Sequence, residues 1–199
     1  MLRIATIVEG RGEVAALPKL LGRIANRVAP GLRLALPRPL RVARNRILKP
    51  GELERYIRMA AADAGVNGCI LILLDADRDC PAELAAEILE RATTERADLR
   101  IRAVAANPEY ESWFLAAIES VASHLGTAAT RPDDPESIRD AKGWLSSSMP
   151  TGRKYRPTIH QARFTAALDL DAARSAPSFD KLWRDVASLL VSPPVSKSE

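Results

Sequence analysis

Acidic side chains follow two segments of this sequence that have the composition of buried strands. Glu9 comes directly after the apolar run 2–8, and Asp75 and Asp77 come directly after the run 69–74. In an open parallel sheet, ligands bind outside the carboxyl ends of the strands, so these carboxylates should converge if the two strands are neighbours. Hard divalent cations prefer such oxygen ligands. The sequence therefore predicts a site for Mg²⁺ or Mn²⁺.

Two more acidic residues lie close to these positions. Glu13 follows Gly10 and Gly12, two glycines that allow a tight turn and the approach of a phosphate, and it falls in the first turn of a predicted helix, where the helix dipole favours a carboxylate. Asp79 extends the acidic run after the second strand. It is either a metal ligand or, as we favour, the cap of the helix that Pro81 begins.

Glu109 and Glu111 open another predicted helix directly after a third strand. One of them could contribute to a second metal site, because two-metal phosphodiester chemistry needs additional ligands. The alternative is that both are first-turn glutamates that complement the helix dipole. Trp113 and Phe114 follow at core spacing and are predicted to pack in the interior rather than stack on bases.

Basic residues are concentrated in one stretch. Residues 23–58 contain ten Lys and Arg and two Glu, a net charge of +8, whereas the whole chain carries +4. Such a distribution suits a polyanion, because each neutralised phosphate releases counterions. We expect Arg41, Arg44 and Arg46 to contact nucleic acid, although solvent-facing arginines without a ligand would give the same pattern.

A second basic segment spans residues 151–160. Arg153, Lys154, Arg156 and His160 could hold a phosphate or balance charge in a transition state, and Tyr155 between them could stack on a base. A solvated basic loop is the alternative.

The elements that position these residues alternate between strand and helix. Apolar runs predict strands over 2–8, 69–74 and 99–105, and helical spacing predicts helices over 13–28, 50–64 and 81–96. The apolar and basic segment 32–42 contains Pro37 and Pro39, so it can supply only an edge strand. This order predicts an α/β fold with a parallel or mixed sheet flanked by helices.

After residue 106 the pattern is helical, which predicts a core over residues 1–106, a helical extension packed on it over 107–191, and a disordered tail over 192–199. No apolar run approaches the ~20 residues that span a bilayer, and the N-terminal residues lack the pattern of a signal peptide. A cytoplasmic location without membrane contact is therefore expected. Two cysteines are too few for a disulfide scaffold.

Two resemblances to known families extend this interpretation. The segment Val8-Glu9-Gly10-x-x-Glu13, followed by a hydrophobic strand that ends in Asp75-x-Asp77, resembles the Toprim domain of topoisomerases, bacterial primases and OLD-type nucleases, over about residues 1–106. The resemblance implies that Glu9 is a general acid/base or metal ligand, that Asp75 and Asp77 bind metal, and that Glu13 is a further ligand, as in the OLD-type pattern.

The second resemblance concerns the rest of the chain. The stretch 107–115 (NPEYESWFL), Ala141-Lys142-x-Trp144-Leu145 and Ser178-Phe179-Asp180-x-Leu182 are similar to a bacterial family called domain of unknown function 4276. This family is regarded as Toprim-like and as a partner of ABC-type ATPases in phage defence. The sequence has no Gly-Lys-Ser/Thr loop and no complete dinucleotide fingerprint, so an ATPase activity would belong to a partner chain.

Together these features predict a Mg²⁺-dependent nuclease, in which Glu9 acts as general acid or base and basic residues bind the nucleic-acid strand. The alternative is a non-catalytic Toprim-like module that binds nucleic acid or an ATPase partner and uses its acids only to fold or dock. The pattern fits DNA and RNA, and endo- and exonucleolytic cleavage, equally, and it is compatible with a homo-oligomer.

Overall fold

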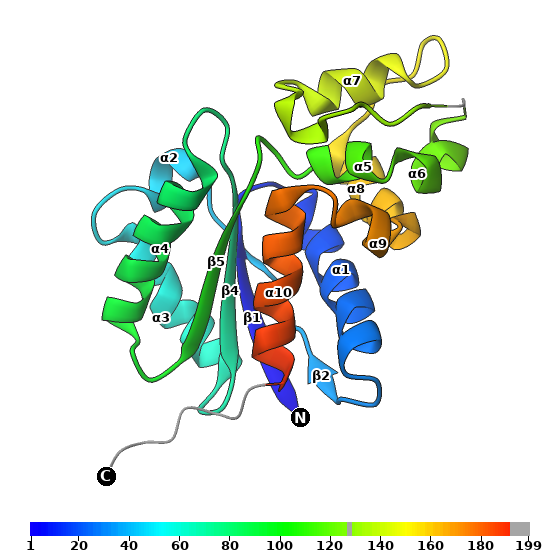
Figure 1. Ribbon diagram of the computed structural model, residues 1–199. Helices are drawn as coiled ribbons and strands as arrows, with labels where there is room; N and C mark the ends of the chain where they lie inside the picture. The colour runs from blue at the N-terminus through cyan, green and yellow to red at the C-terminus, as the bar shows by residue number, and fades with distance from the viewer. Residues whose placement is uncertain (127–128, 192–199) are drawn as a thin grey trace.

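The computed structural model describes residues 1–126 and 129–191. At its centre is a five-stranded sheet in the order β2-β1-β4-β5, with β3 also paired to β1, and every pairing is parallel. Helices cover both faces of this sheet (Figure 1). The α/β fold class predicted from the alternation of strands and helices is confirmed.

The three long strands are β1 (Leu2–Val8), β4 (Cys69–Asp75) and β5 (Arg100–Ala106). Nearly every residue of β4 is buried, which explains its uninterrupted aliphatic sequence, because a parallel strand between two helical layers has no solvent face. Val8 pairs with Leu73, and Asp75 pairs with Ala106. The carboxyl ends of all three strands therefore meet at one edge.

The outer edge beside β1 consists of two short strands, β2 (Leu34–Ala35) and β3 (Leu40–Arg41). The first pairs with the beginning of β1 and the second with its end. Pro37 lies between them, and a proline has no N–H to donate to a sheet. The predicted edge strand is confirmed, but the chain divides it into two.

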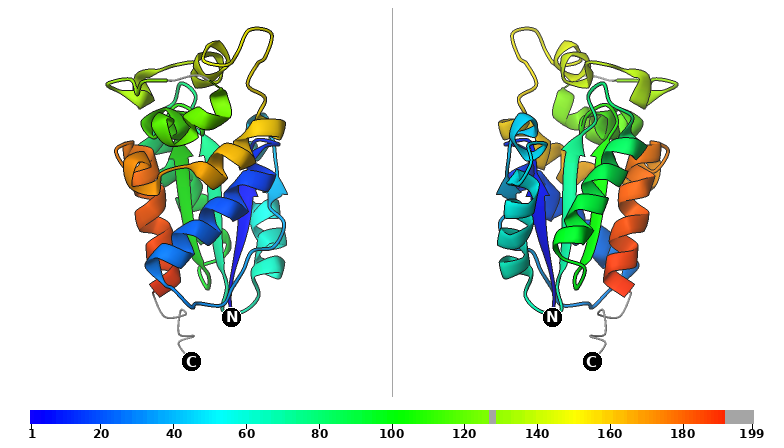
Figure 2. Two further views of the ribbon diagram at one scale, coloured as in Figure 1. Left: turned by 90° about the vertical axis from the view of Figure 1, so that its right-hand side faces the viewer. Right: turned by 90° about the vertical axis from the view of Figure 1, so that its left-hand side faces the viewer.

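Two layers of helices enclose the sheet (Figure 2). Helices α2 (Arg44–Ile47), α3 (Glu52–Ala64) and α4 (Pro81–Glu95) cover one face. Helices α1 (Glu13–Val28) and α10 (Pro177–Val191) cover the other.

The remaining helices are short, and several of them lie beyond the carboxyl ends of the strands (Figure 1). They are α5 (Ser112–Ala116), α6 (Ile118–Leu125), a 3₁₀ turn η1 (Pro135–Ser137), α7 (Ala141–Ser147), α8 (Pro157–Ala167) and α9 (Leu170–Ala173). The helix predicted to begin at Glu109 and Glu111 begins later, at Ser112, and it is interrupted, because Ala117 leaves the helical conformation and separates α5 from α6.

One hydrophobic cluster joins the sheet face below α1 to the helices that follow residue 106. Trp113 and Phe114 of α5 are fully buried in it, so the prediction that they pack in the interior is confirmed. The Trp113 Nε1–H donates to Ser178 Oγ at 2.8 Å and thereby ties α5 to α10. Residues 107–191 thus share a hydrophobic core with the sheet.

The predicted disordered tail, 192–199, lies outside the described residues. Within 1–126 and 129–191, none of the helices combines the length and the apolar character needed to traverse a lipid bilayer.

Candidate active site at the carboxyl edge of the sheet

The site lies where the chain connections diverge. From β1 the chain passes through α1 on one face of the sheet, and from β4 it passes through α4 on the opposite face. The loops after these two neighbouring strands therefore separate, and such a switch point forms the ligand crevice of an open α/β sheet. Glu9 follows β1, and Asp75 is the last residue of β4. The expectation that these residues lie at the same edge is confirmed by the strand register.

Glu13 is folded back against the loop that precedes it. Its Oε2 accepts the backbone N–H groups of Glu9 and Gly10, each at 3.2 Å. A Cβ on Gly10 would lie 2.5 Å from the Glu13 Oε1, so a larger residue there would displace the Glu13 carboxyl. Burial raises the pKa of Glu13 to about 7, the Gly10 N–H partly offsets this, and the negative charge of Glu111 adds to it.

Asp75 connects β4 to the segment after β5. Its Oδ1 accepts the backbone N–H of Tyr110 at 2.9 Å. Burial raises the pKa of Asp75 well above its ordinary value, the charge of Glu13 raises it further, and the Lys142 ammonium acts in the opposite direction. This carboxyl is therefore poised to take up either a proton or a cation.

Lys142, at the start of α7, gathers three of the acids. Its Nζ lies 3.0 Å from Glu111 Oε2 and 3.8 Å from Asp75 Oδ2, and it also contacts Glu109 Oε2. The backbone N–H of Lys142 donates to Glu109 Oε1 at 2.8 Å, which fixes the start of α7 over the site. A resident ammonium thus lies among carboxylates from two different loops.

Glu111 is almost completely buried, and its Oε1 accepts the hydroxyl of Tyr155 at 3.0 Å. Burial raises the pKa of Glu111, and Lys142 partly offsets the effect. The interpretation of Glu109 and Glu111 as plain first-turn glutamates is wrong, since neither side chain caps α5 and both are engaged by Lys142.

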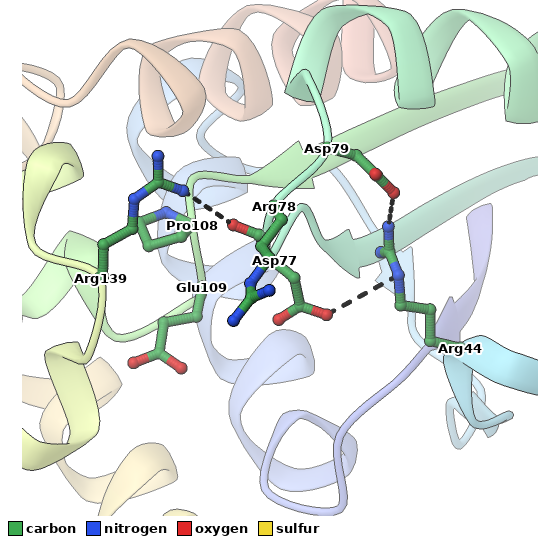
Figure 3. Close-up of a pocket in the computed structure, with 7 residues that line it drawn as sticks. All are labelled: Arg44, Asp77, Arg78, Asp79, Pro108, Glu109 and Arg139. Carbon is green, nitrogen blue, oxygen red and sulfur yellow. Dashed lines mark hydrogen bonds and ion pairs between the residues drawn. The ribbon is translucent and has the colours of Figure 1, made fainter.

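Arg44 forms the opposite wall of the site (Figure 3). Its guanidinium donates to the backbone carbonyl of Asp75 and to the carboxylate of Asp79, and its Nε lies 3.7 Å from Asp77 Oδ2. Only 15% of the Arg44 side chain is exposed, so this residue belongs to the site rather than to an open basic surface. The preferred reading of Asp79 as a helix cap is wrong, because Cys80 is the N-cap of α4 and makes no side-chain cap, while Asp79 turns to Arg44.

Asp77 projects toward solvent from a constrained backbone. Its φ of 53° lies in the left-handed region, its N–H donates to the Pro108 carbonyl at 2.8 Å, and its own carbonyl accepts from Arg139 at 3.4 Å. The Asp77 side chain is 58% exposed and faces a pocket of about 840 Å³. Figure 3 shows the residues that line this pocket: Arg44, Asp77, Arg78, Asp79, Pro108, Glu109 and Arg139.

Glu9 is the acid with the least compensation. Its Oε2 is buried and has no hydrogen-bond partner among the described residues. Burial raises the pKa of Glu9, the charge of Asp77 raises it further, and Arg44 lowers it. A carboxylate in this state takes up a proton more readily than an ordinary glutamate, or binds a cation.

The donor set fits a hard divalent cation, although the side chains have not closed around one. Within residues 1–126 and 129–191, no three His, Cys, Asp or Glu side chains already have the arrangement of a metal site. The unpartnered Glu9 oxygen, together with Asp75 and Asp77, supplies oxygen ligands of the kind that Mg²⁺ uses. The predicted ligands Glu13, Asp79, Glu109 and Glu111 are engaged by backbone N–H groups, Arg44 or Lys142.

The other predicted nucleic-acid contacts lie outside this pocket. Arg41 is exposed on β3, and Arg46 on α2 pairs with Glu52 at 2.6 Å. Arg153 and Lys154 are exposed in the loop before α8.

Within that loop, the backbone N–H of Arg156 donates to His160 Nδ1 at 2.8 Å, so His160 caps the start of α8. The suggestion that Tyr155 stacks on a base is wrong, because its ring is buried against Phe114 and Phe164 and its hydroxyl binds Glu111.

The glycine after Arg11 also has a different role from the one expected. A Cβ on Gly12 would lie 2.8 Å from the Pro157 carbonyl and would collide with the Gln161 side chain. This glycine therefore permits α8 to approach the start of α1, and no phosphate can occupy that space.

The sequence analysis missed Lys142 and Arg139 as site residues. The signal for Lys142 was its place in the Ala141-Lys142-x-Trp144 segment, and nothing in the local pattern singled out Arg139.

Comparison with curated proteins and with solved structures gave no significant match. Comparison with protein-family models matched residues 8–187 to a domain of unknown function, DUF4276. That range includes every acidic residue of the site and Lys142. Because the match spans far more than half of the chain, the protein belongs to the DUF4276 family.

Proposed function

We propose that this protein is a Mg²⁺- or Mn²⁺-dependent nuclease that hydrolyses phosphodiester bonds at the carboxyl edge of its sheet. The observation that carries the proposal is the buried, unpartnered Glu9 oxygen beside Asp75 and Asp77 at the switch point. Leaving a buried polar atom without a partner costs free energy, and a cation ligand would supply the missing interaction. The parallel sheet and the Glu-Gly and Asp-x-Asp motifs at neighbouring strand ends also support membership of the Toprim superfamily.

In this proposal Glu9, Asp75 and Asp77 would hold the cation. A bound divalent ion would neutralise phosphate charge and lower the pKa of a water molecule. Glu9, whose pKa burial raises, is suited to exchanging a proton with a reacting oxygen.

On the wall of the pocket, Arg139 is exposed and Arg44 faces the same space, so both can orient an incoming phosphate. Lys142 keeps Glu109 and Glu111 in place and limits the repulsion around Asp75.

The test is cleavage of end-labelled single- and double-stranded DNA and RNA in Mn²⁺, in Mg²⁺ and in EDTA. Glu9→Gln and Asp77→Asn preserve side-chain volume and should abolish metal-dependent cleavage. Asp133→Asn is the matched control, because Asp133 is exposed and has no side-chain partner among the described residues. Cleavage that persists in Glu9→Gln at the wild-type rate would exclude this site as its source.

A second function is favoured by the ion pairs of the site. Lys142 and Arg44 already compensate several of the acids, as would be expected of a non-catalytic module that binds nucleic acid or an ATPase partner. The two functions differ in their response to metal. A catalytic site should show a higher melting temperature in excess Mg²⁺ or Mn²⁺ through linkage, whereas a module whose acids only fold or dock should show no such response.

Family resemblance supports two further parts of the proposal: a separate ABC-type ATPase chain as partner, and a role in phage defence in the cytoplasm. Co-purification of this protein with an ATPase encoded beside it, and loss of that complex after charge reversal on one surface, would test the partnership directly.

A further inference from the structure

A groove separate from the acidic pocket runs along the open edge of the sheet. It has a volume of about 770 Å³. The β3 edge, including Pro37 and Pro39, lines it together with Arg11 and Val14 near the start of α1 and Tyr56 and Met59 of α3. We refer to it as the sheet-edge groove.

Three arginines of this groove have no partners. Arg11, Arg38 and Arg41 are exposed, and their side chains take part in no ion pair or hydrogen bond within the described residues. Neighbouring arginines behave differently: Arg46 pairs with Glu52, and Arg58 pairs with Glu95. The uncompensated guanidinium groups give the groove a positive potential that attracts anions.

Acidic groups hardly offset this charge. Asp63 is the only acidic residue that lines the groove among the described residues, against three arginines. The backbone carbonyl of Asp63 accepts the Arg3 Nε–H at 2.8 Å, which leaves its carboxylate free to reduce the charge by one. The lining therefore retains a net charge of about +2, which suits more than one phosphate of an extended ligand.

The groove also offers a surface for a planar, apolar group. Tyr56 lines it and is only partly buried where it packs on the core, and the Arg55 guanidinium lies over its ring at 4.4 Å from the centroid. Met59 is 43% exposed. Guanidinium groups beside an aromatic ring and an apolar floor are the features with which proteins bind single-stranded nucleic acid.

The groove reaches the loops of the proposed active site. Arg11 is two residues after Glu9, and Arg41 is three residues before Arg44. Arg41 pairs with Val8, the residue before Glu9, and Arg44 lines the acidic pocket three residues later, so the groove and the pocket both lie near the carboxyl end of β1. A strand held along the sheet edge would thus arrive at the acidic pocket.

We infer that the sheet-edge groove binds a single strand of DNA or RNA and leads it to the acidic pocket, with Arg38 and Arg41 holding phosphates and Tyr56 stacking on a base. This inference rests on the proposed function only in the statement that the bound strand leads to the acidic pocket, because binding in the groove itself requires no cleavage. A single strand is specified because only unpaired bases can stack on a side chain. A groove of this volume is also in the range of sites for small ligands.

The experiment measures binding of fluorescent oligonucleotides in EDTA, so that cleavage plays no part. The test variants are Arg38→Glu/Arg41→Glu, the milder Arg38→Gln/Arg41→Gln, and Tyr56→Leu. Lys19→Glu/Arg33→Glu is the matched control, because both residues are exposed, lie outside the groove, and change the net charge equally. Circular dichroism establishes that each variant is folded.

The charge reversal should weaken binding of a single strand at least about tenfold and lower the slope of log affinity against log salt by about 1.4, which is about 0.7 for each phosphate contact. Tyr56→Leu should weaken binding roughly 5- to 100-fold with an unchanged salt slope, as expected of one stacked base. The control variant should bind like the wild type.

Several results would overturn the inference. One is an equal loss in the control variant, which would indicate a general effect of charge. Another is tighter binding of duplex than of single strand. A third is displacement of the oligonucleotide by a glutamate-rich peptide at lower concentration than by unlabelled oligonucleotide, which would assign the groove to an acidic protein partner. If the wild type binds single strands in the groove but never cleaves them, the inference about the groove stands and the nuclease proposal fails. If the groove variants bind and cleave like the wild type, the inference about the groove fails and the nuclease proposal stands.

Discussion

Replacement of Glu13 by glutamine should stabilise the metal-free protein at alkaline pH. The Glu13 carboxyl is buried, and its pKa is raised from an ordinary value of 4.5 to about 7. The folded protein therefore holds this proton more tightly than the unfolded chain, so that stability falls as the pH rises from 4.5 to 7. Glutamine has the shape of the neutral carboxyl, and its oxygen can still accept the N–H groups of Glu9 and Gly10.

The magnitude follows from the two pKa values. A pKa raised from 4.5 to about 7 corresponds to about 3 kcal/mol at pH 8, where the carboxylate is charged in both states. Little solvent screening applies, because Glu13 is only 3% exposed. For a chain of this length, about 3 kcal/mol corresponds to a melting temperature about 6 to 12 °C higher.

The assay is urea unfolding of the wild type and of Glu13→Gln in EDTA at pH 5, 6, 7 and 8. The two proteins should differ least at pH 5 and should diverge as the pH rises, with the variant more stable. Glu119→Gln, which changes an exposed glutamate of α6, should show no divergence. A Glu13→Gln variant that is less stable than the wild type at pH 8, or a difference that does not depend on pH, would refute the view that burial disfavours the charged form of Glu13 in the folded state.

Three further substitutions test other parts of the site. Asp77→Asn should leave metal-free stability unchanged or slightly higher, because asparagine tolerates the positive φ, while the Mg²⁺-induced gain in melting temperature shrinks; an equal gain in both proteins would show that Asp77 is no ligand. Lys142→Met should lower stability at pH 8 by about 1–3 kcal/mol, a value reduced for its partial exposure. The loss should be smaller at pH 5, because burial raises the pKa of Asp75 and of Glu111 and so favours their neutral forms; urea unfolding at both pH values measures this, and an unchanged stability at pH 8 would contradict the pairing. Gly12→Ala should cost about 1–3 kcal/mol in the same assay, because its Cβ would crowd the Pro157 carbonyl, and a stable variant would mean that α8 does not approach α1 closely.

Strand patterns and strand ends were the parts of the protein that sequence could predict. The aliphatic run of β4 and the more mixed run of β1 are local signals, and both strands form where the sequence predicts them. The convergence of Glu9 and Asp75 then follows from general geometry, because the carboxyl ends of neighbouring parallel strands share an edge. The same logic placed Glu109 and Glu111 near that edge, after β5.

The basic side chains of the site could not be predicted in this way. Lys142 lies 33 residues after Glu109 along the chain, on a helix whose spacing gives an ordinary partly exposed lysine. Its position among the acids depends on how α7 folds back over the sheet, which is a tertiary effect. Arg44 was assigned to an open surface from local charge density, and only the approach of α2 to the end of β4 reveals that it binds Asp75 and Asp79.

The division of the acids into paired and unpaired groups is the strongest argument that the site binds a ligand. Burying a charge without a partner is expensive, and proteins that need an acid only for folding pair it with a cation or with backbone N–H groups. Glu111 and Asp79 follow this rule through Lys142 and Arg44. Glu9 follows it only in part. Burial and the charge of Asp77 raise its pKa, and Arg44, the backbone N–H of Asp75 and Lys142 act in the opposite direction. Its buried Oε2 nevertheless has no hydrogen-bond partner among the described residues. Exceptions to the rules that a fold obeys elsewhere are found mainly at functional sites. The unpartnered oxygen of Glu9 is such an exception, it lies at the switch point of the sheet, and a bound cation would supply its missing partner.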